Sequence, residues 1–132
     1  MFTTRIYYQD TDAGAIVYYA NYLKFVEKSW FEYLLSIGLS IPRWQAMGVY
    51  IIVRKASLDL IEPVRYADLI TVQTEIREVK NAYFMLSHVI CKDDGEITTR
   101  CETKMVCVDN KGKPKRMPDE FRSVLLQNAK ME

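Results

Sequence analysis

The sequence predicts one α+β domain, in which a long amphipathic helix is followed by a series of β-strands. Apolar residues recur at helical spacing over residues 18–37, whereas residues 49–108 contain four runs typical of strands, separated by turn signals. No internal repeat, linker or low-complexity tract interrupts the 132 residues. Because a chain of this length corresponds to about one domain, we expect a single domain over residues 1–132.

The N-terminal segment begins as a strand and then becomes a loop. Residues Thr3–Tyr8 alternate and include β-branched and aromatic side chains, a pattern typical of a strand. Residues Gln9–Val17 contain Asp10, Asp12 and Gly14, which favour a turn or irregular loop. We therefore expect a strand that leads into an acidic loop.

A long helix is expected from Tyr18 to about Ile37. Its apolar stripe consists of Tyr22, Val26, Trp30, Tyr33, Leu34 and Ile37. Gly38 is suited to cap its C-terminus, and Ile41–Gly48 could add a short helical turn.

The strands are expected at residues 49–61, 68–79, 83–92 and 96–108. Their separators are Glu62-Pro63, Lys80-Asn81 and Asp93-Asp94-Gly95, and the last contains the Asp-Gly pair of hairpin turns. Pro118-Asp119-Glu120 then resembles a helix start, so we expect a short helix to about Ala129. This order predicts an antiparallel sheet that could wrap the long helix.

The strand expected at 83–92 is apolar on both faces. One face carries Tyr83, Met85, Val89 and Cys91, and the other carries Phe84, Leu86 and Ile90. One helix can cover only one of these faces. A second copy of the chain is the simplest cover for the other, so we expect a homo-oligomer.

Charge and composition limit the partners. Eighteen basic and seventeen acidic residues leave a formal charge of +1, so no long-range field draws the molecule to nucleic acid or anionic lipid. The N-terminus lacks the pattern of a signal peptide, and no apolar run is long enough to span a membrane. We expect a cytoplasmic protein without a nucleic-acid partner.

Metal and histidine chemistry are not favoured. Three cysteines without CxxC spacing and a single histidine, His88, leave too few ligands for a structural zinc site. His88 lies in the middle of an expected strand, where a structural or interface hydrogen bond is the favoured role. We therefore expect no metal and no catalytic histidine.

The acidic loop leads directly into the start of the long helix, and this arrangement suits acyl transfer. The first turn of a helix presents backbone N–H groups without intrahelical partners, which can stabilise negative charge on a carbonyl oxygen. A carboxylate nearby can act as a nucleophile or as a general base on water. Asp10 and Asp12 are the carboxylates that this loop offers.

The motif in this segment resembles that of a known family. Asp10, Asp12, Gly14, Val17, Tyr18 and Tyr22 match the pattern D-x-D-x-x-G-x-V-Y-x-x-x-Y of the 4-hydroxybenzoyl-CoA thioesterase family. The resemblance is strongest to its YbgC-like branch of acyl-CoA thioesterases. It extends to the later segments Arg54-Lys55-Ala56, Asp59, Pro63-Val64-Arg65, Asp68-Leu69 and Val106-Cys107-Val108-Asp109.

The resemblance implies a fold and a site. The fold is the hotdog, a curved antiparallel sheet of about five strands wrapped around one long helix, with active sites at the junction of two subunits. Asp12 would be the catalytic carboxylate, Asp10 would support the loop, and the backbone N–H of Tyr19 would polarise the thioester carbonyl. Glu27 on the helix is the reserve candidate, because some enzymes of this fold use a helix carboxylate as base. The substrate-binding residues implied are Gly14, Val17, Tyr18 and Tyr22, with Val49 and Tyr50 from the partner subunit. Coenzyme A would be approached by Lys80, Asn81, Lys115 and Arg116.

The implied activity is hydrolysis of an acyl-CoA thioester, with coenzyme A as part of the substrate and no separate cofactor. Many YbgC-like members carry histidine where this chain has Tyr19, which leaves an aromatic acyl-CoA substrate as an alternative, such as 4-hydroxybenzoyl-CoA or 1,4-dihydroxy-2-naphthoyl-CoA. A third possibility is a module that binds acyl carrier protein and hydrolyses weakly. Both a dimer and a tetramer of hotdog subunits are compatible with the sequence.

Overall fold

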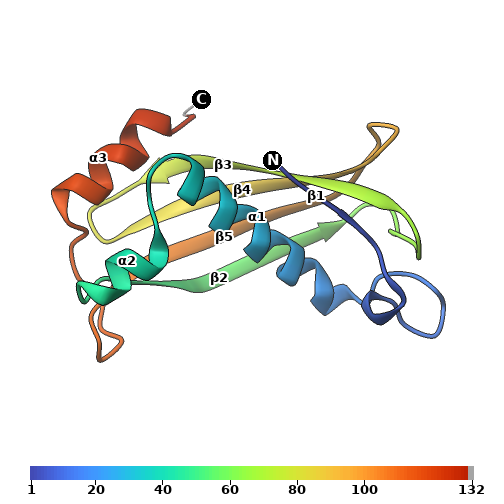
Figure 1. Ribbon diagram of the computed structural model, residues 1–132, viewed down its shortest axis with the longest axis horizontal. Helices are drawn as coiled ribbons and strands as arrows, with labels where there is room; N and C mark the ends of the chain where they lie inside the picture. Colours follow the sequence, from blue (N-terminus) through green and yellow to red (C-terminus); the bar gives the residue numbers. More distant parts are fainter. Residues whose placement is uncertain (131–132) are drawn as a thin grey trace. The chain divides into compact units, whose positions relative to one another are not determined.

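The computed structural model describes residues 1–130, and its elements follow the predicted order (Figure 1). The elements are β1 (Phe2–Arg5), the 3₁₀ helices η1 (Tyr8–Asp10) and η2 (Tyr19–Asn21), α1 (Tyr22–Ser36), α2 (Ile41–Ala46), β2 (Tyr50–Leu60), β3 (Leu69–Val79), β4 (Tyr83–Lys92), β5 (Ile97–Val108) and α3 (Asp119–Asn128). The strands form one sheet in the order β1-β3-β4-β5-β2, and β1 runs antiparallel to β3. The predicted α+β class is confirmed.

The four strands after the long helix each begin and end within one residue of the predicted positions. Their turns explain this agreement. Gly95 adopts a left-handed φ of 90° between β4 and β5, and its N–H donates to the Lys92 carbonyl at 2.9 Å. Few residues other than glycine adopt this conformation without strain, so the Asp-Gly signal fixed the hairpin.

The prediction for the first strand was wrong at its C-terminal end. β1 ends at Arg5 and does not continue to Tyr8. The Asp10 carboxylate accepts the N–H of Tyr7 at 2.8 Å, and the Asp10 N–H donates to the Tyr7 carbonyl at 3.0 Å. These local bonds give the backbone an alternative to the sheet and close the turn η1.

The start of the long helix also differs from the prediction. Regular α-helix begins at Tyr22, and residues 19–21 form the tighter turn η2. The Asn21 side chain donates to the Asp10 carbonyl at 2.9 Å, which ties this turn to the preceding loop. The helix ends as predicted, because Gly38 has a left-handed φ of 94° and the Leu39 N–H donates to the Leu34 carbonyl at 2.8 Å.

The described residues divide into two compact units, which we call the first and the second unit. The first comprises residues 1–32, 58–74 and 88–101, and the second comprises residues 33–57, 75–87 and the chain from 102 onward. The core of the first unit consists of Ile6, Val17, Tyr22, Phe25, Val64, Ile70, Val72 and Ile90, with Phe2 and Leu58 packed against it. The loop 6–17 and the start of α1 are therefore anchored by apolar burial in one core.

The second unit has an aromatic core. Phe121 of α3 is fully buried, with its ring centroid 5.4 Å from that of Trp44 and 6.2 Å from that of Phe84. Leu125 occupies the next turn of α3 and is also fully buried. Burial of these side chains fixes α3 within this unit.

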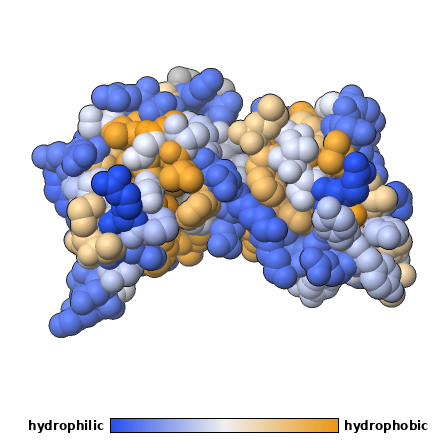
Figure 2. Space-filling model, in the orientation of Figure 1, coloured by the Kyte–Doolittle hydropathy of each residue, from blue (hydrophilic) through white to orange (hydrophobic). Residues whose placement is uncertain are grey.

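The two faces of β4 differ in burial, as its alternation predicts. Phe84, Leu86, His88 and Ile90 are buried, whereas Tyr83, Met85, Val89 and Cys91 are half-buried. Hydrophobic side chains also reach the surface among hydrophilic ones on the face that Figure 2 shows. The single chain thus leaves one face of β4 incompletely covered.

Candidate active site

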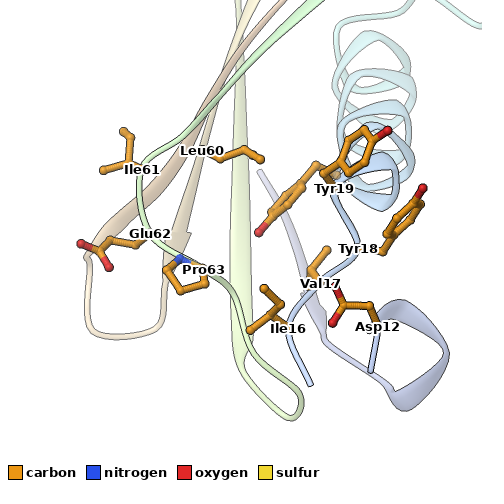
Figure 3. A pocket seen from close by; sticks show the side chains of 10 residues that line it. Asp12, Ile16, Val17, Tyr18, Tyr19, Leu60, Ile61, Glu62 and Pro63 are labelled. Atoms are coloured by element: carbon orange, nitrogen blue, oxygen red, sulfur yellow. The ribbon is translucent and has the colours of Figure 1, made fainter. Parts of the chain in front are cut away.

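A pocket of about 380 Å³ lies in the first unit, beside the start of the helical region. One side is formed by the loop and the first helical turns, and the other by the end of β2 and the residues after it (Figure 3). Its lining residues are Asp12, Ile16, Val17, Tyr18, Tyr19, Tyr22, Leu60, Ile61, Glu62 and Pro63. The lining is thus mostly apolar and aromatic, and it includes two acidic residues, Asp12 and Glu62. In Figure 3, Leu60 points toward the tyrosines while Glu62 points away.

Hydrogen bonds within the loop hold the Asp12 backbone and side chain. The Asp12 N–H donates to the Ile16 carbonyl at 2.9 Å, and the Ala15 N–H donates to the Asp12 carbonyl at 3.0 Å. The Gly14 N–H donates to Oδ1 of Asp12 at 2.8 Å. Asp12 is exposed in the single chain, so its position depends on these bonds and not on burial.

A second set of backbone contacts fixes the loop to the segment after β2. The Val17 N–H donates to the Val64 carbonyl at 2.8 Å, and the Tyr66 N–H donates to the Ala15 carbonyl at 3.0 Å. Ile16 and Arg65 form an antiparallel bridge between these two contacts. Ala15 has a φ of 62°, a left-handed conformation uncommon for alanine, and these contacts maintain it.

Two backbone N–H groups at the start of the helical region remain available. The Tyr18 N–H donates to the Asp10 carbonyl at 3.1 Å, and the Asn21 N–H donates to the Tyr18 carbonyl at 2.8 Å. Within residues 1–130, the N–H groups of Tyr19 and Ala20 donate to no backbone carbonyl. They are first-turn donors without intrahelical partners, at the positive end of the helical region.

Tyrosine side chains form the aromatic part of the pocket. The rings of Tyr18 and Tyr19 lie 4.9 Å apart between centroids and are 46% and 61% exposed. Tyr22 is buried, and its hydroxyl accepts the Val64 N–H at 3.4 Å. Burial raises the pKa of Tyr22, and a hydrogen bond with Tyr19 raises the pKa of Tyr18, so both phenols stay neutral at physiological pH.

The structure gathers only part of the predicted site. Asp12, Val17, Tyr18, Tyr19 and Tyr22 line the one pocket. Gly14 does not line it, but is bonded to the Asp12 side chain. The reserve carboxylate, Glu27, is exposed on α1 and lies outside the pocket lining.

The remaining predicted residues belong to the second unit. Val49 is buried and Tyr50 begins β2, and neither lines the pocket. Lys80, Asn81, Lys115 and Arg116 are also in this unit.

Contacts in the second unit bring the predicted cationic residues near each other. The Met117 N–H donates to the Asn81 carbonyl at 2.8 Å, so Arg116 lies next to the β3–β4 turn. Arg122 of α3 donates through Nε to the Lys80 carbonyl at 3.1 Å. Lys115 instead reaches the Gly48 carbonyl at 3.4 Å. We call Lys80, Asn81, Arg116 and Arg122 the β3–β4 basic group.

The sequence did not predict several residues of the pocket lining and of the β3–β4 basic group. Leu60, Ile61, Glu62 and Pro63 line the pocket, yet the sequence indicated only the end of a strand and a turn there. Arg122 was read only as part of a short helix. In both cases a contact between segments far apart in the chain, which no local pattern encodes, creates the association.

His88 is part of a buried polar chain outside the pocket. Its Nδ1 lies 2.9 Å from Oγ1 of Thr74, which lies 2.7 Å from Oγ of Ser29. All three side chains are buried, and burial lowers the pKa of His88 to about 4. These hydrogen bonds between Ser29, Thr74 and His88 link α1, β3 and β4 in the first unit.

Two further findings concern ligands and membranes. Within residues 1–130, no group of three or more His, Cys, Asp or Glu side chains is placed to hold a metal ion. No helix of the same residues has both the length and the apolar composition that a membrane crossing requires.

Comparison with known proteins gives consistent matches. Residues 7–125 match the model of the thioesterase-like superfamily. The acyl-CoA thioester hydrolase YbgC of Escherichia coli O6:H1 is 34% identical over 115 residues, which is 86% of each chain. A solved gentisyl-coenzyme A thioesterase is 25% identical, with a TM-score of 0.86 over 96% of this chain and 99% of its own.

A third match concerns the fold alone. The DHNA-CoA thioesterase of Staphylococcus aureus is 18% identical, with a TM-score of 0.90 over 96% of this chain and 87% of its own.

The chain belongs to the thioesterase-like superfamily. The family resemblance and the hotdog fold predicted from the sequence are confirmed.

The buried His88 predicts a pH dependence of stability. Below pH 6.5 an unfolded chain binds a proton at this imidazole, whereas the folded chain does not until about pH 4. The free energy of unfolding should therefore decrease as the pH falls through this window, by about 3 kcal/mol at pH 4. Urea unfolding of the wild type and His88→Gln from pH 7 to pH 4 measures it. The variant should show a flatter dependence, and equal slopes would contradict the prediction.

Proposed function

We propose that this chain hydrolyses acyl-CoA thioesters, with Asp12 as the catalytic carboxylate and the Tyr19 N–H as a donor to the thioester carbonyl. The observation that carries the proposal is the placement of Asp12 and Tyr19 in one pocket, at the start of a helical region whose first N–H groups lack backbone acceptors. Family membership supports the reaction class, because the E. coli relative is named an acyl-CoA thioester hydrolase.

The reaction follows from these groups. The thioester oxygen accepts a hydrogen bond from the Tyr19 N–H, which stabilises the negative charge that develops as the carbonyl carbon is attacked. Asp12 either attacks this carbon itself, giving a mixed anhydride that water then hydrolyses, or takes a proton from the attacking water. In both routes the C–S bond breaks, coenzyme A leaves as a thiolate that is then protonated, and the acid is released.

The pocket lining suits an apolar or aromatic acyl group. Ile16, Val17 and Leu60 provide apolar contacts, and the Tyr18–Tyr19 pair provides aromatic surface. The tyrosine pair favours an aromatic acyl-CoA as the second candidate substrate, since stacked and edge contacts between rings are favourable. The gentisyl-coenzyme A relative supports the same direction.

The β3–β4 basic group is proposed to approach the phosphates of coenzyme A. Lys80 and Arg116 are 55% and 63% exposed, and each also pairs with one carboxylate, Glu78 at 3.3 Å and Asp119 at 3.6 Å. Cations near phosphate oxygens form charge-assisted hydrogen bonds. The same surface would suit an acidic acyl carrier protein, which is the alternative in which binding exceeds hydrolysis.

A homo-oligomer is proposed from two features of the sheet. β2 is an edge strand of eleven residues, whose outer edge has no neighbouring strand among residues 1–130. Such an edge is suited to pairing with another chain. The half-buried face of β4 offers a second surface for a further copy.

Replacement of Asp12 tests the mechanism. Asp12→Asn keeps the size of the side chain and removes its charge, so hydrolysis should fall at least about a hundredfold with little change in Tm. Glu27→Gln is the matched control and should keep wild-type activity. Steady-state rates with short-chain, aromatic and long-chain acyl-CoAs check the result, and equal activity of Asp12→Asn would exclude the mechanism.

The same substrates decide between the candidate functions. A kcat/KM highest for 4-hydroxybenzoyl- or 1,4-dihydroxy-2-naphthoyl-CoA would favour the aromatic candidate. If no substrate is hydrolysed but acylated carrier protein is retained in a pull-down, the binding module is the correct assignment.

The β3–β4 basic group should act on substrate binding and not on the chemical step. Lys80→Ala combined with Arg116→Ala should raise KM for an acyl-CoA about tenfold and leave kcat nearly unchanged. The control Lys111→Ala changes an exposed lysine of the turn after β5 and should have little effect. An acyl-pantetheine thioester lacks the nucleotide, so its KM should be the same for the double variant and the wild type. An equal effect on both substrates would rule out the phosphate contact.

The edge of β2 should control assembly. Analytical ultracentrifugation of the wild type should give two or four times the chain mass of 15.5 kDa. Ile52→Lys combined with Val53→Lys places two charges on exposed apolar positions of β2 and should lower this mass. Leu126→Lys, at a similarly exposed position of α3, is the control. A monomeric wild type would refute the proposal.

A further inference from the structure

The two oxygens of the Asp12 carboxylate have different environments. Oδ1 accepts the N–H of Gly14 at 2.8 Å, whereas no hydrogen bond from the described residues reaches Oδ2. This hydrogen bond restricts rotation of the Asp12 side chain, and the restriction also fixes the orientation of Oδ2. Asp12 therefore presents one oxygen that is held and one that is available to the pocket.

Gly14 differs from the other four glycines of the chain. Gly38, Gly48, Gly95 and Gly112 have left-handed φ values between 82° and 94°, and a Cβ at any of them would meet no atom within 4 Å. Their backbone conformation explains why they are glycine. Gly14 has no left-handed φ, but a Cβ at this residue would lie 3.3 Å from Oδ1 of Asp12. At Gly14 the close neighbour of an added Cβ is therefore the Asp12 carboxylate, which would have to shift by a few tenths of an ångström.

We infer that Gly14 is a positioning residue, whose N–H orients the Asp12 carboxylate and whose lack of a side chain permits this contact. The inference rests on the proposed function, since it assigns Gly14 a role through Asp12. It also replaces the expectation that Gly14 binds the substrate directly.

The surrounding loop cannot easily absorb a side chain at residue 14. Its backbone is fixed on both sides, by the Asp12–Ile16 hydrogen bond and by the contact between Ala15 and Tyr66. A methyl group at residue 14 would therefore displace the carboxylate by a few tenths of an ångström and not the backbone. Small errors in the position of a reacting group reduce rates strongly, because the attack requires near-contact geometry.

Gly14→Ala tests this inference. We expect kcat for the best acyl-CoA substrate to fall about tenfold, with KM and Tm close to wild-type values. Gly14→Val, with a larger side chain, should lower kcat further. Ala13→Ser adds one atom to the neighbouring exposed residue, and should leave kcat within about twofold.

A double-mutant cycle distinguishes positioning from a general loss of structure. If Gly14 acts through the Asp12 carboxylate, Gly14→Ala should have no further effect on the residual rate of Asp12→Asn. A tenfold loss in both backgrounds would overturn the inference. So would an unchanged kcat in Gly14→Ala while Asp12→Asn is inactive. A wild type without thioesterase activity, or an active Asp12→Asn, would instead reject the proposed function, and the inference with it.

Discussion

The site depends on the backbone pairing between the loop 11–17 and the segment 64–66. The hydrogen bond from Val17 to the Val64 carbonyl and the bond from Tyr66 to the Ala15 carbonyl fix the loop next to the end of β2. Asp12 is exposed, so these contacts, and not burial of its side chain, connect the loop that carries it to the rest of the first unit. Val17, which makes one of these bonds, lies two residues before η2, whose Tyr19 and Ala20 N–H groups have no backbone acceptor among residues 1–130. The Asp12 carboxylate and these N–H groups therefore lie on one continuous segment that backbone hydrogen bonds hold in place.

The charged residues of the proposed site lie at the surface, whereas the single histidine lies in the core. Asp12, Lys80 and Arg116 are exposed, whereas the one histidine, His88 of β4, is buried with its Nδ1 2.9 Å from Oγ1 of Thr74 on β3. A buried imidazole with a satisfied hydrogen bond contributes to the core without adding a charge at neutral pH. The proposed mechanism uses a carboxylate and backbone amides, and so assigns His88 a structural role only.

The sequence predicted the elements well because their signals are local. The Asp-Gly turn, the Gly38 cap and the alternation of β4 each depend on a few adjacent residues, and their positions agree with the structure. The errors lie in the segment 6–21, where the Asp10 side chain and carbonyl form bonds that compete with strand and helix. The opposite wall of the pocket, Leu60 to Pro63, could not be predicted, because its approach to Asp12 arises from tertiary contacts.

The left-handed Ala15 has a consequence for how sharply the loop is defined. Glycine at this position would adopt φ near 62° without steric cost, but would also give the loop many more backbone shapes to sample. Alanine accepts about 1 kcal/mol of strain and in return narrows the loop's conformational ensemble. Fewer competing shapes mean that a larger fraction of molecules holds the Asp12 side chain in the orientation seen in the structure at any moment.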